Sequence, residues 1–203
     1  MEKSLQKLLR GLFAFQTKCH SHDKDLMDVL STEGQKPEVM IVSCCDSRVD
    51  PAILLQCKPG DLFVVRNVAN IIPPLRHDVQ CHSTSAALEF AVCFLNIKHL
   101  IILGHSQCGG IEAFLNKNQL WPNDFISNWV SLTQLKRDAF VDVDSCAKAS
   151  LNRSYNNCRT YPWIRERLDN NTLTIHRWFF NIKELEIFAY SDEENEYKRL
   201  KIN

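Results

Sequence analysis

Apolar residues recur at helical spacing over the first thirty positions of the chain. Leucine or phenylalanine stands at positions 5, 8, 9, 12 and 13, and a second apolar set follows at 26, 29 and 30. This spacing predicts amphipathic helices. A polar break near Cys19–Ser21 divides the segment, so we predict two helices that form an N-terminal helical arm.

Three short apolar runs further along have the composition of buried strands: Val39–Val42, Leu62–Val65 and Leu100–Leu103. Helical patterns separate them. One begins at Asp50-Pro51, a favourable N-cap and first helical residue, and others run over 83–96 and 110–115. Strands that alternate with helices predict a parallel sheet with helices on both faces.

The last third of the chain changes from a helical to a strand-like pattern. Residues 124 to about 168 are helical, and the runs 172–180 and 184–190 predict a hairpin that turns near 181–183. The charged tail, 191–203, is expected to fray. We therefore predict an α/β fold: a mostly parallel central β-sheet flanked by helices, an N-terminal helical arm and a C-terminal antiparallel edge strand. It is one domain, 1–203, made of the arm (1–32), the core (33–190) and the tail.

Composition and charge argue against two classes of partner. The chain has 24 Lys plus Arg and 24 Asp plus Glu, so its formal net charge is +0, and no basic field is available for nucleic acid. No apolar run approaches the roughly 18 residues of a membrane span. The start, MEKSLQKLLRGLF, is too charged for a signal peptide. We expect a cytoplasmic protein with no membrane partner.

Two short segments carry metal-binding residue types directly after predicted strands. The segment CCDSR (44–48) follows the first strand, and GHSQCGG (104–110) follows the third. Both lie at the carboxyl edge of a parallel sheet, where they can converge. Cys44, His105 and Cys108 offer two thiolates and an imidazole, a good Zn²⁺ ligand set that leaves a fourth position for water. We predict one Zn²⁺ per chain at these residues.

The neighbouring residues predict what the metal site does. A carboxylate is itself a good zinc ligand, so Asp46 must be kept off an open zinc ion. Arg48 can hold it in a bidentate ion pair. Asp46 can then accept a hydrogen bond from a zinc-bound hydroxide. Gly109 and Gly110 allow the backbone to pass close to the metal, with N–H groups for an oxygen that develops negative charge. Cys45 should point away from Cys44, and we expect it to be a buried spare thiol.

These motifs, in this order and spacing, resemble those of the β-class carbonic anhydrases. CxDSR followed by GHxxCGG carries the resemblance, together with RNVAN (66–70). The run DLFVVRNVAN (61–70) followed by Pro73-Pro74, the run SAALEFAV (85–92), and TYP (160–162) are similar to the plant-like branch. The resemblance covers about residues 33–190.

The resemblance implies a carbonate dehydratase that reversibly hydrates carbon dioxide to bicarbonate by attack of zinc-bound hydroxide. It implies the zinc ligands predicted above and an Asp46–Arg48 dyad. Gln35 would donate its amide to the substrate, Phe63 and Val68 would line an apolar pocket, and Phe90 replaces a frequent tyrosine. Gln35 and Phe63 would reach the zinc of the neighbouring subunit, so a homodimer or a multiple of dimers is expected.

Three other uses of the same residues stay open. A closed structural zinc site needs a fourth permanent ligand, which Asp46 could be, although Arg48 makes better sense as its restraint. The same zinc ligands would serve hydrolysis of carbon disulfide, and a zinc-reserve protein would bind the metal without turnover.

Ile41 stands where some β-class enzymes carry a tryptophan that helps to build a bicarbonate pocket. We therefore expect no bicarbonate switch and an open resting site.

Overall fold

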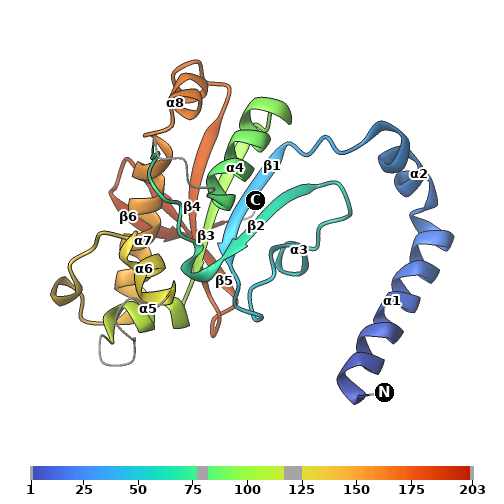
Figure 1. The fold of residues 1–203 in the computed structure, drawn as a ribbon, viewed down its shortest axis with the longest axis horizontal. Coiled ribbons are helices and arrows are strands. Elements are labelled where there is room, and N and C mark those ends of the chain that lie inside the picture. Colours follow the sequence, from blue (N-terminus) through green and yellow to red (C-terminus); the bar gives the residue numbers. More distant parts are fainter. Residues whose placement is uncertain (1, 77–81, 117–124, 202–203) are drawn as a thin grey trace. The chain divides into compact units, whose positions relative to one another are not determined.

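The computed structural model describes residues 2–76, 82–116 and 125–201 of this protein (Figure 1). The chain divides into two compact units, Met1–Lys36 and Pro37–Asn203. The division lies four residues beyond the predicted end of the arm at residue 32. That the whole chain acts as one domain remains a prediction.

The N-terminal unit consists of two consecutive helices, as the apolar spacing predicted. Helix α1 spans Lys3–His22 and α2 spans Lys24–Glu33. The break falls at Asp23, slightly later than expected, and the Asp23 N–H closes α1 on the Cys19 carbonyl. Large apolar side chains of α1 are exposed, with Leu8 at 69% and Phe13 at 72%, so this unit leaves an apolar face open.

A six-stranded sheet forms the centre of the second unit, in the order β2-β1-β3-β4-β5-β6. The strands are β1 (Val39–Cys44), β2 (Leu62–Asn67), β3 (His99–His105), β4 (Thr174–Asn181), β5 (Glu186–Ser191) and β6 (Glu196–Arg199). β1 pairs in parallel with β2 and β3, and β3 with β4, whereas β5 and β6 continue the sheet antiparallel. The predicted mostly parallel α/β fold is confirmed.

Helices connect the strands at the predicted places. They are α3 (Pro51–Leu54), α4 (Ser83–Glu89), α5 (Gly109–Leu115), α6 (Phe125–Ser131), α7 (Val143–Cys158) and α8 (Pro162–Asp169), with short turns η1 (Val68–Asn70), η2 (Phe90–Phe94) and η4 (Arg137–Ala139). The helix predicted over 83–96 changes to a π-helical turn at Phe90, a feature that often occurs at functional sites. α4 packs against β2, and α7 packs against β3 and β4.

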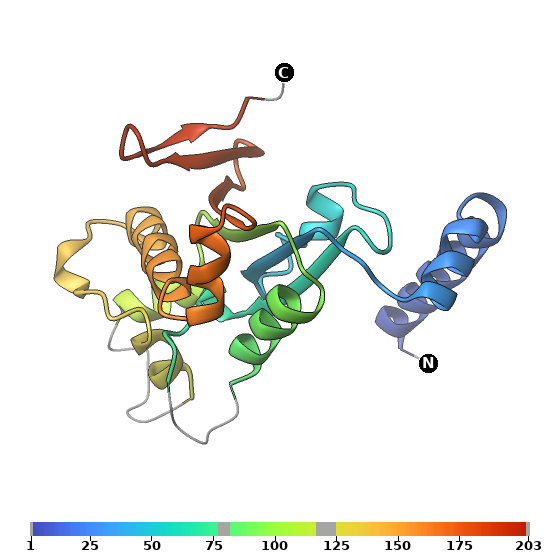
Figure 2. The same cartoon turned by 90° about the horizontal axis from the view of Figure 1, so that it is seen from above.

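The prediction that the charged tail frays was wrong for Glu196–Arg199, which forms β6. Figure 2 shows the β5–β6 hairpin at the edge of the sheet. The Tyr197 ring packs against Phe179 and Tyr190, with centroids 6.4 and 5.1 Å apart. The backbone pairing with β5, the ion pair of Arg199 with Glu186 and the packing of Tyr197 together hold this strand on the sheet. The antiparallel edge therefore consists of two strands, β5 and β6, where one was predicted.

No helix within the described ranges combines the length and the apolar content that crossing a bilayer requires.

Candidate metal centre

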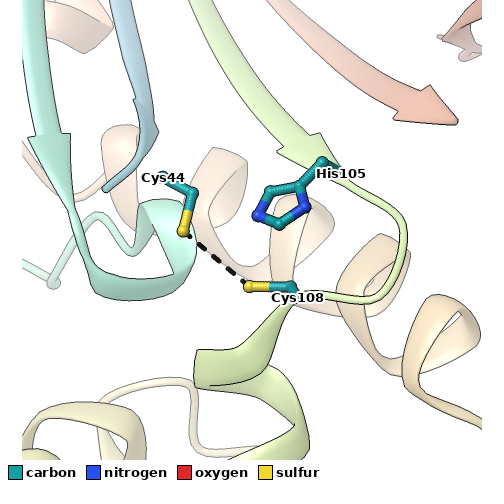
Figure 3. Close-up of side chains that lie close together, drawn as sticks. All are labelled: Cys44, His105 and Cys108. Atoms are coloured by element: carbon teal, nitrogen blue, oxygen red, sulfur yellow. Dashed lines mark hydrogen bonds between the residues drawn. The ribbon is translucent and has the colours of Figure 1, made fainter. Parts of the chain in front are cut away.

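Three predicted zinc ligands converge at the carboxyl ends of two adjacent strands (Figure 3). Cys44 ends β1, His105 ends β3, and Cys108 is the N-cap of α5. Their ligand atoms all lie within 4.8 Å of one another, and the two Sγ atoms are 3.9 Å apart. All three side chains are buried. β1 and β3 are parallel neighbours, which is why Cys44 and Cys108, 64 residues apart in the chain, meet here.

The orientation of His105 fits a metal ligand. Its Nδ1 lies 2.9 Å from the carbonyl oxygen of Ser106, and because a carbonyl only accepts, Nδ1 carries the proton. Nε2 therefore presents a lone pair. This atom is buried, and no side chain or backbone group in the described part of the chain hydrogen-bonds to it. An unpaired buried nitrogen is unfavourable unless it binds something, so the observation supports a metal at this position.

The two thiols form a hydrogen-bonded pair. Hydrogen bonding from Cys108 lowers the pKa of Cys44 below its ordinary value. The same contact, together with burial, raises the pKa of Cys108 well above its ordinary value. The pair thus shares one proton, which a metal would displace. Two sulfurs and one imidazole nitrogen at these separations fit zinc.

Asp46 and Arg48 form the predicted ion pair next to the ligands. Arg48 Nε and Nη2 donate to Asp46 Oδ1 and Oδ2 at 2.9 and 2.7 Å, and the Arg48 N–H donates to Oδ1 at 2.9 Å. The Arg48 guanidinium holds the pKa of Asp46 well below its usual range. Asp46 Oδ2 also lies 3.9 Å from His105 Nε2. An ionised, restrained carboxylate therefore faces the metal position.

Arg66 supports the backbone beneath this pair. Its guanidinium donates to the carbonyls of Cys44 and Asp46 at 3.0 and 2.8 Å, and it forms an ion pair with Asp50 at 2.6 Å. Asp50 in turn caps α3. The sequence motif identified Arg66, but the motif alone did not indicate this supporting role.

Two further supports were not found from the sequence. Trp129 of α6 donates its indole N–H to the Val68 carbonyl at 2.7 Å. Asp144 of α7 accepts a hydrogen bond at 2.8 Å from the backbone N–H of Gln107. Gln107 lies in residues 105–108, the ligand loop, which joins two of the predicted ligands. Only a prediction of tertiary contacts could have found either, because the partners are 61 and 37 residues apart.

Of the predicted pocket residues, Val68 lies beside the start of α5, directly after the ligand loop. A Cβ added to Gly110 would come within 2.6 Å of Val68 Cγ1, so the glycine at the start of α5 allows this close approach. Gly109 is the first residue of α5, directly after Cys108, and the space around its Cα is open.

The predicted aromatic residues contact each other. The rings of Phe63 and Phe90 lie 5.9 Å apart, and Phe94 stacks on Phe90 at 5.6 Å. Phe90 is 43% exposed. Gln35 belongs to the N-terminal unit, where its side chain is exposed. The substrate contacts of these three predicted residues remain predictions.

The expectation of a buried Cys45 was wrong, since its side chain is exposed. Cys45 follows the last residue of β1, and its N–H donates to the Asn67 carbonyl at 3.0 Å. This bond continues the pairing with β2 for one residue beyond Cys44. The two neighbouring thiols differ in burial, and their opposite orientation remains a prediction.

Comparisons with known proteins agree on one family. A family model described as "Carbonic anhydrase" matches residues 39–187. A carbonic anhydrase of Synechocystis sp. is 34% identical over 92% of this chain and 71% of its own length. The chloroplastic beta carbonic anhydrase 5 of Arabidopsis thaliana is 36% identical over 79% of this chain and 54% of its own length.

Solved structures show the same relationship. The β-carbonic anhydrase CcaA superposes with a TM-score of 0.88 at 30% identity, covering 100% of this chain and 94% of that one. A β-carbonic anhydrase of Sordaria macrospora, described as tetrameric, gives 0.80 at 29% identity, covering 93% of this chain and 97% of that one. Sequence, fold and the geometry of the Cys–His–Cys cluster therefore lead to the same conclusion: this chain belongs to the β-class carbonic anhydrases.

Proposed function

We propose that this chain reversibly hydrates carbon dioxide to bicarbonate at a zinc ion held by Cys44, His105 and Cys108. The observation that carries the proposal is the buried cluster of three ligand atoms within 4.8 Å, beside the Arg48-restrained carboxylate of Asp46. Membership of the β class supports the same reaction.

The chain's own residues would divide the work between binding and orientation. When bound, zinc supplies Lewis acidity, which lowers the pKa of water towards neutrality. Asp46 accepts a hydrogen bond from the attacking oxygen and directs its lone pair towards carbon dioxide. Arg48 keeps both Asp46 oxygens engaged, so the carboxylate stays off the metal and the site remains open. This arrangement favours catalysis over a closed structural zinc site.

The substrate pocket would be apolar on one side and polar on the other. Phe63, Val68 and Phe90 provide apolar walls suited to carbon dioxide, which has no net dipole. The Gly109 N–H and the Gln35 amide would donate to bicarbonate oxygens. Phe90 contributes no hydroxyl, so the polar contacts depend on Gln35 and Gly109.

A homodimer or a multiple of dimers would complete this pocket. The exposed apolar face of α1 supports a subunit contact, and one related structure is described as tetrameric. The proposed arrangement places Gln35 and Phe63 at the zinc of the neighbouring subunit. The cytoplasmic location remains a prediction, because the curated relatives include chloroplastic and mitochondrial enzymes.

Stopped-flow hydration of carbon dioxide, measured on protein with a determined zinc content, tests the function. Turnover proportional to zinc, with about one zinc per chain, would support it. Full zinc loading without hydration would contradict it and favour a zinc-reserve role. Parallel assays with carbon disulfide separate the remaining enzymatic alternative.

A further inference from the structure

Asp144 connects the ligand loop, residues 105–108, to α7. Asp144 is not itself one of the predicted metal ligands. It lies in the first turn of α7, half-buried, and its Oδ1 accepts the Gln107 backbone N–H at 2.8 Å. Gln107 stands between the ligands His105 and Cys108. Any contact that fixes the Gln107 peptide therefore acts on both ligands.

Gln107 requires such a contact because its backbone is in the left-handed region, with φ of 55°. Residues other than glycine remain there only when the surrounding structure holds them. The Gln107 carbonyl is also bound, since it accepts a hydrogen bond from Arg48 Nη2 at 3.2 Å. Charged side chains from two other parts of the chain thus hold both backbone groups of this residue.

The same helix supports the start of the loop. A Cβ added at Gly104 would meet Leu151 Cδ1 of α7 at 3.0 Å, so the end of β3 lies directly on that helix. Ser106 fixes the opposite side, because its N–H donates to the Phe180 carbonyl and its Oγ accepts the Ile182 N–H, both at 2.9 Å. Asp144 supplies the contact to α7 at Gln107 itself.

We propose that Asp144 is a positioning residue for the zinc site: it holds Gln107 in the left-handed conformation and so sets the approach of His105 and Cys108 to the metal. The inference rests on the proposed function, because it concerns the same site. It assigns a role to a carboxylate that touches neither the metal position nor the substrate pocket.

The experiment measures zinc affinity by competition with a chromophoric chelator, independently of turnover. Asp144→Ala should weaken zinc binding by about 10–100-fold, as loss of a ligand-orienting partner typically does. Asp144→Asn retains an oxygen acceptor and should bind zinc nearly as tightly as the wild type. The matched control is Asp142→Ala, which removes the N-cap of the same helix and its bond to the Ser145 N–H. It should lower the melting temperature but leave zinc affinity unchanged.

Gln107→Gly tests the backbone argument, because glycine adopts positive φ without strain. Combined with Asp144→Ala, it should restore much of the lost affinity; alone, it should bind zinc at least as tightly as the wild type. The inference is overturned if Asp144→Ala binds zinc like the wild type, if Asp142→Ala loses as much affinity, or if Gln107→Gly alone binds zinc more weakly. Wild-type protein that binds no zinc would instead overturn the proposed function.

Discussion

Cys44 and Cys45 are chain neighbours in different environments, so the two thiols should differ in their importance for zinc. Cys44 is 5% exposed and faces Cys108, whereas Cys45 is exposed. Cys44→Ser should lose both zinc and hydration activity, because it removes one of three metal donors. Cys45→Ser is the matched control and should keep most of each. Zinc analysis and stopped-flow assays check both variants, and zinc loss in Cys45→Ser would reverse the assignment.

Asp46 should affect turnover without affecting metal content. Asp46→Asn replaces the carboxylate oxygen that orients the attacking group with an amide, so we expect kcat/KM to fall by about 10²–10⁴-fold. Zinc content should stay at one per chain, since Asp46 is not among the ligands. Asp61→Asn, at a surface turn where Asp61 accepts the Lys58 N–H, is the control and should leave kcat/KM unchanged. Equal rates for Asp46→Asn and wild type would remove Asp46 from the mechanism.

Activity should rise towards alkaline pH. Two thiolate ligands would cancel the formal charge of Zn²⁺, so the ion would acidify water less than it would with three neutral histidines. Protonation of Asp46 does not cause the fall in kcat/KM at lower pH. The Arg48 guanidinium holds the pKa of Asp46 well below its usual range, so the carboxylate stays ionised throughout the range of the assay. A profile of kcat/KM from pH 6 to 9.5 checks this, and a plateau already at pH 6 would contradict it.

Helix α6 contacts the turn that carries Val68. Ala69 and Asn70 have φ of 62° and 45°, so η1 contains two consecutive left-handed residues that are not glycine. Trp129 of α6 binds the carbonyl at the start of this turn. Such a turn holds its conformation only because neighbouring elements keep it in place.

Trp129→Phe should therefore change substrate affinity more than metal content. It keeps an aromatic ring but removes the N–H donor, which should lower the free energy of unfolding by about 1 kcal/mol. KM for carbon dioxide should rise several-fold as the Val68 wall loosens, with zinc unchanged. Stopped-flow kinetics and urea unfolding measure the two effects. Trp163→Phe, in α8 against Tyr161, is the control, and an equal rise in KM there would refute the role of Trp129.

We expect the α1 arm to determine how the subunits of this protein assemble. Leu8 and Leu12 are 69% and 53% exposed, and they lie one turn apart on the helix. Leu8→Asp combined with Leu12→Asp should shift sedimentation from a dimer or larger species towards a monomer, because the apolar contact is lost. Lys7→Asp, which alters only the polar face, should not. An active wild-type monomer at assay concentration would rule out the shared active site.

The sequence alone determined five of the six strands, most helices and the candidate metal donors, because these follow from local patterns; β6 was not predicted. Apolar runs such as Val39–Val42 indicate strands wherever they pack, and the order of strands and helices restricts the sheet to a mostly parallel form. Once β1 and β3 are parallel neighbours, Cys44 and His105 must end at the same edge. The residue types then indicate zinc.

Only the tertiary structure decided what holds the site together. The contacts of Asp144 with Gln107 and of Trp129 with Val68 join residues far apart in the chain, so no local pattern could indicate them. The exposure of Cys45 and the pairing of β6 with β5 likewise follow from contacts between segments, which no local pattern indicates. The left-handed backbone at Gln107 has the same origin: local preference opposes it, and contacts from Arg48 and Asp144 stabilise it.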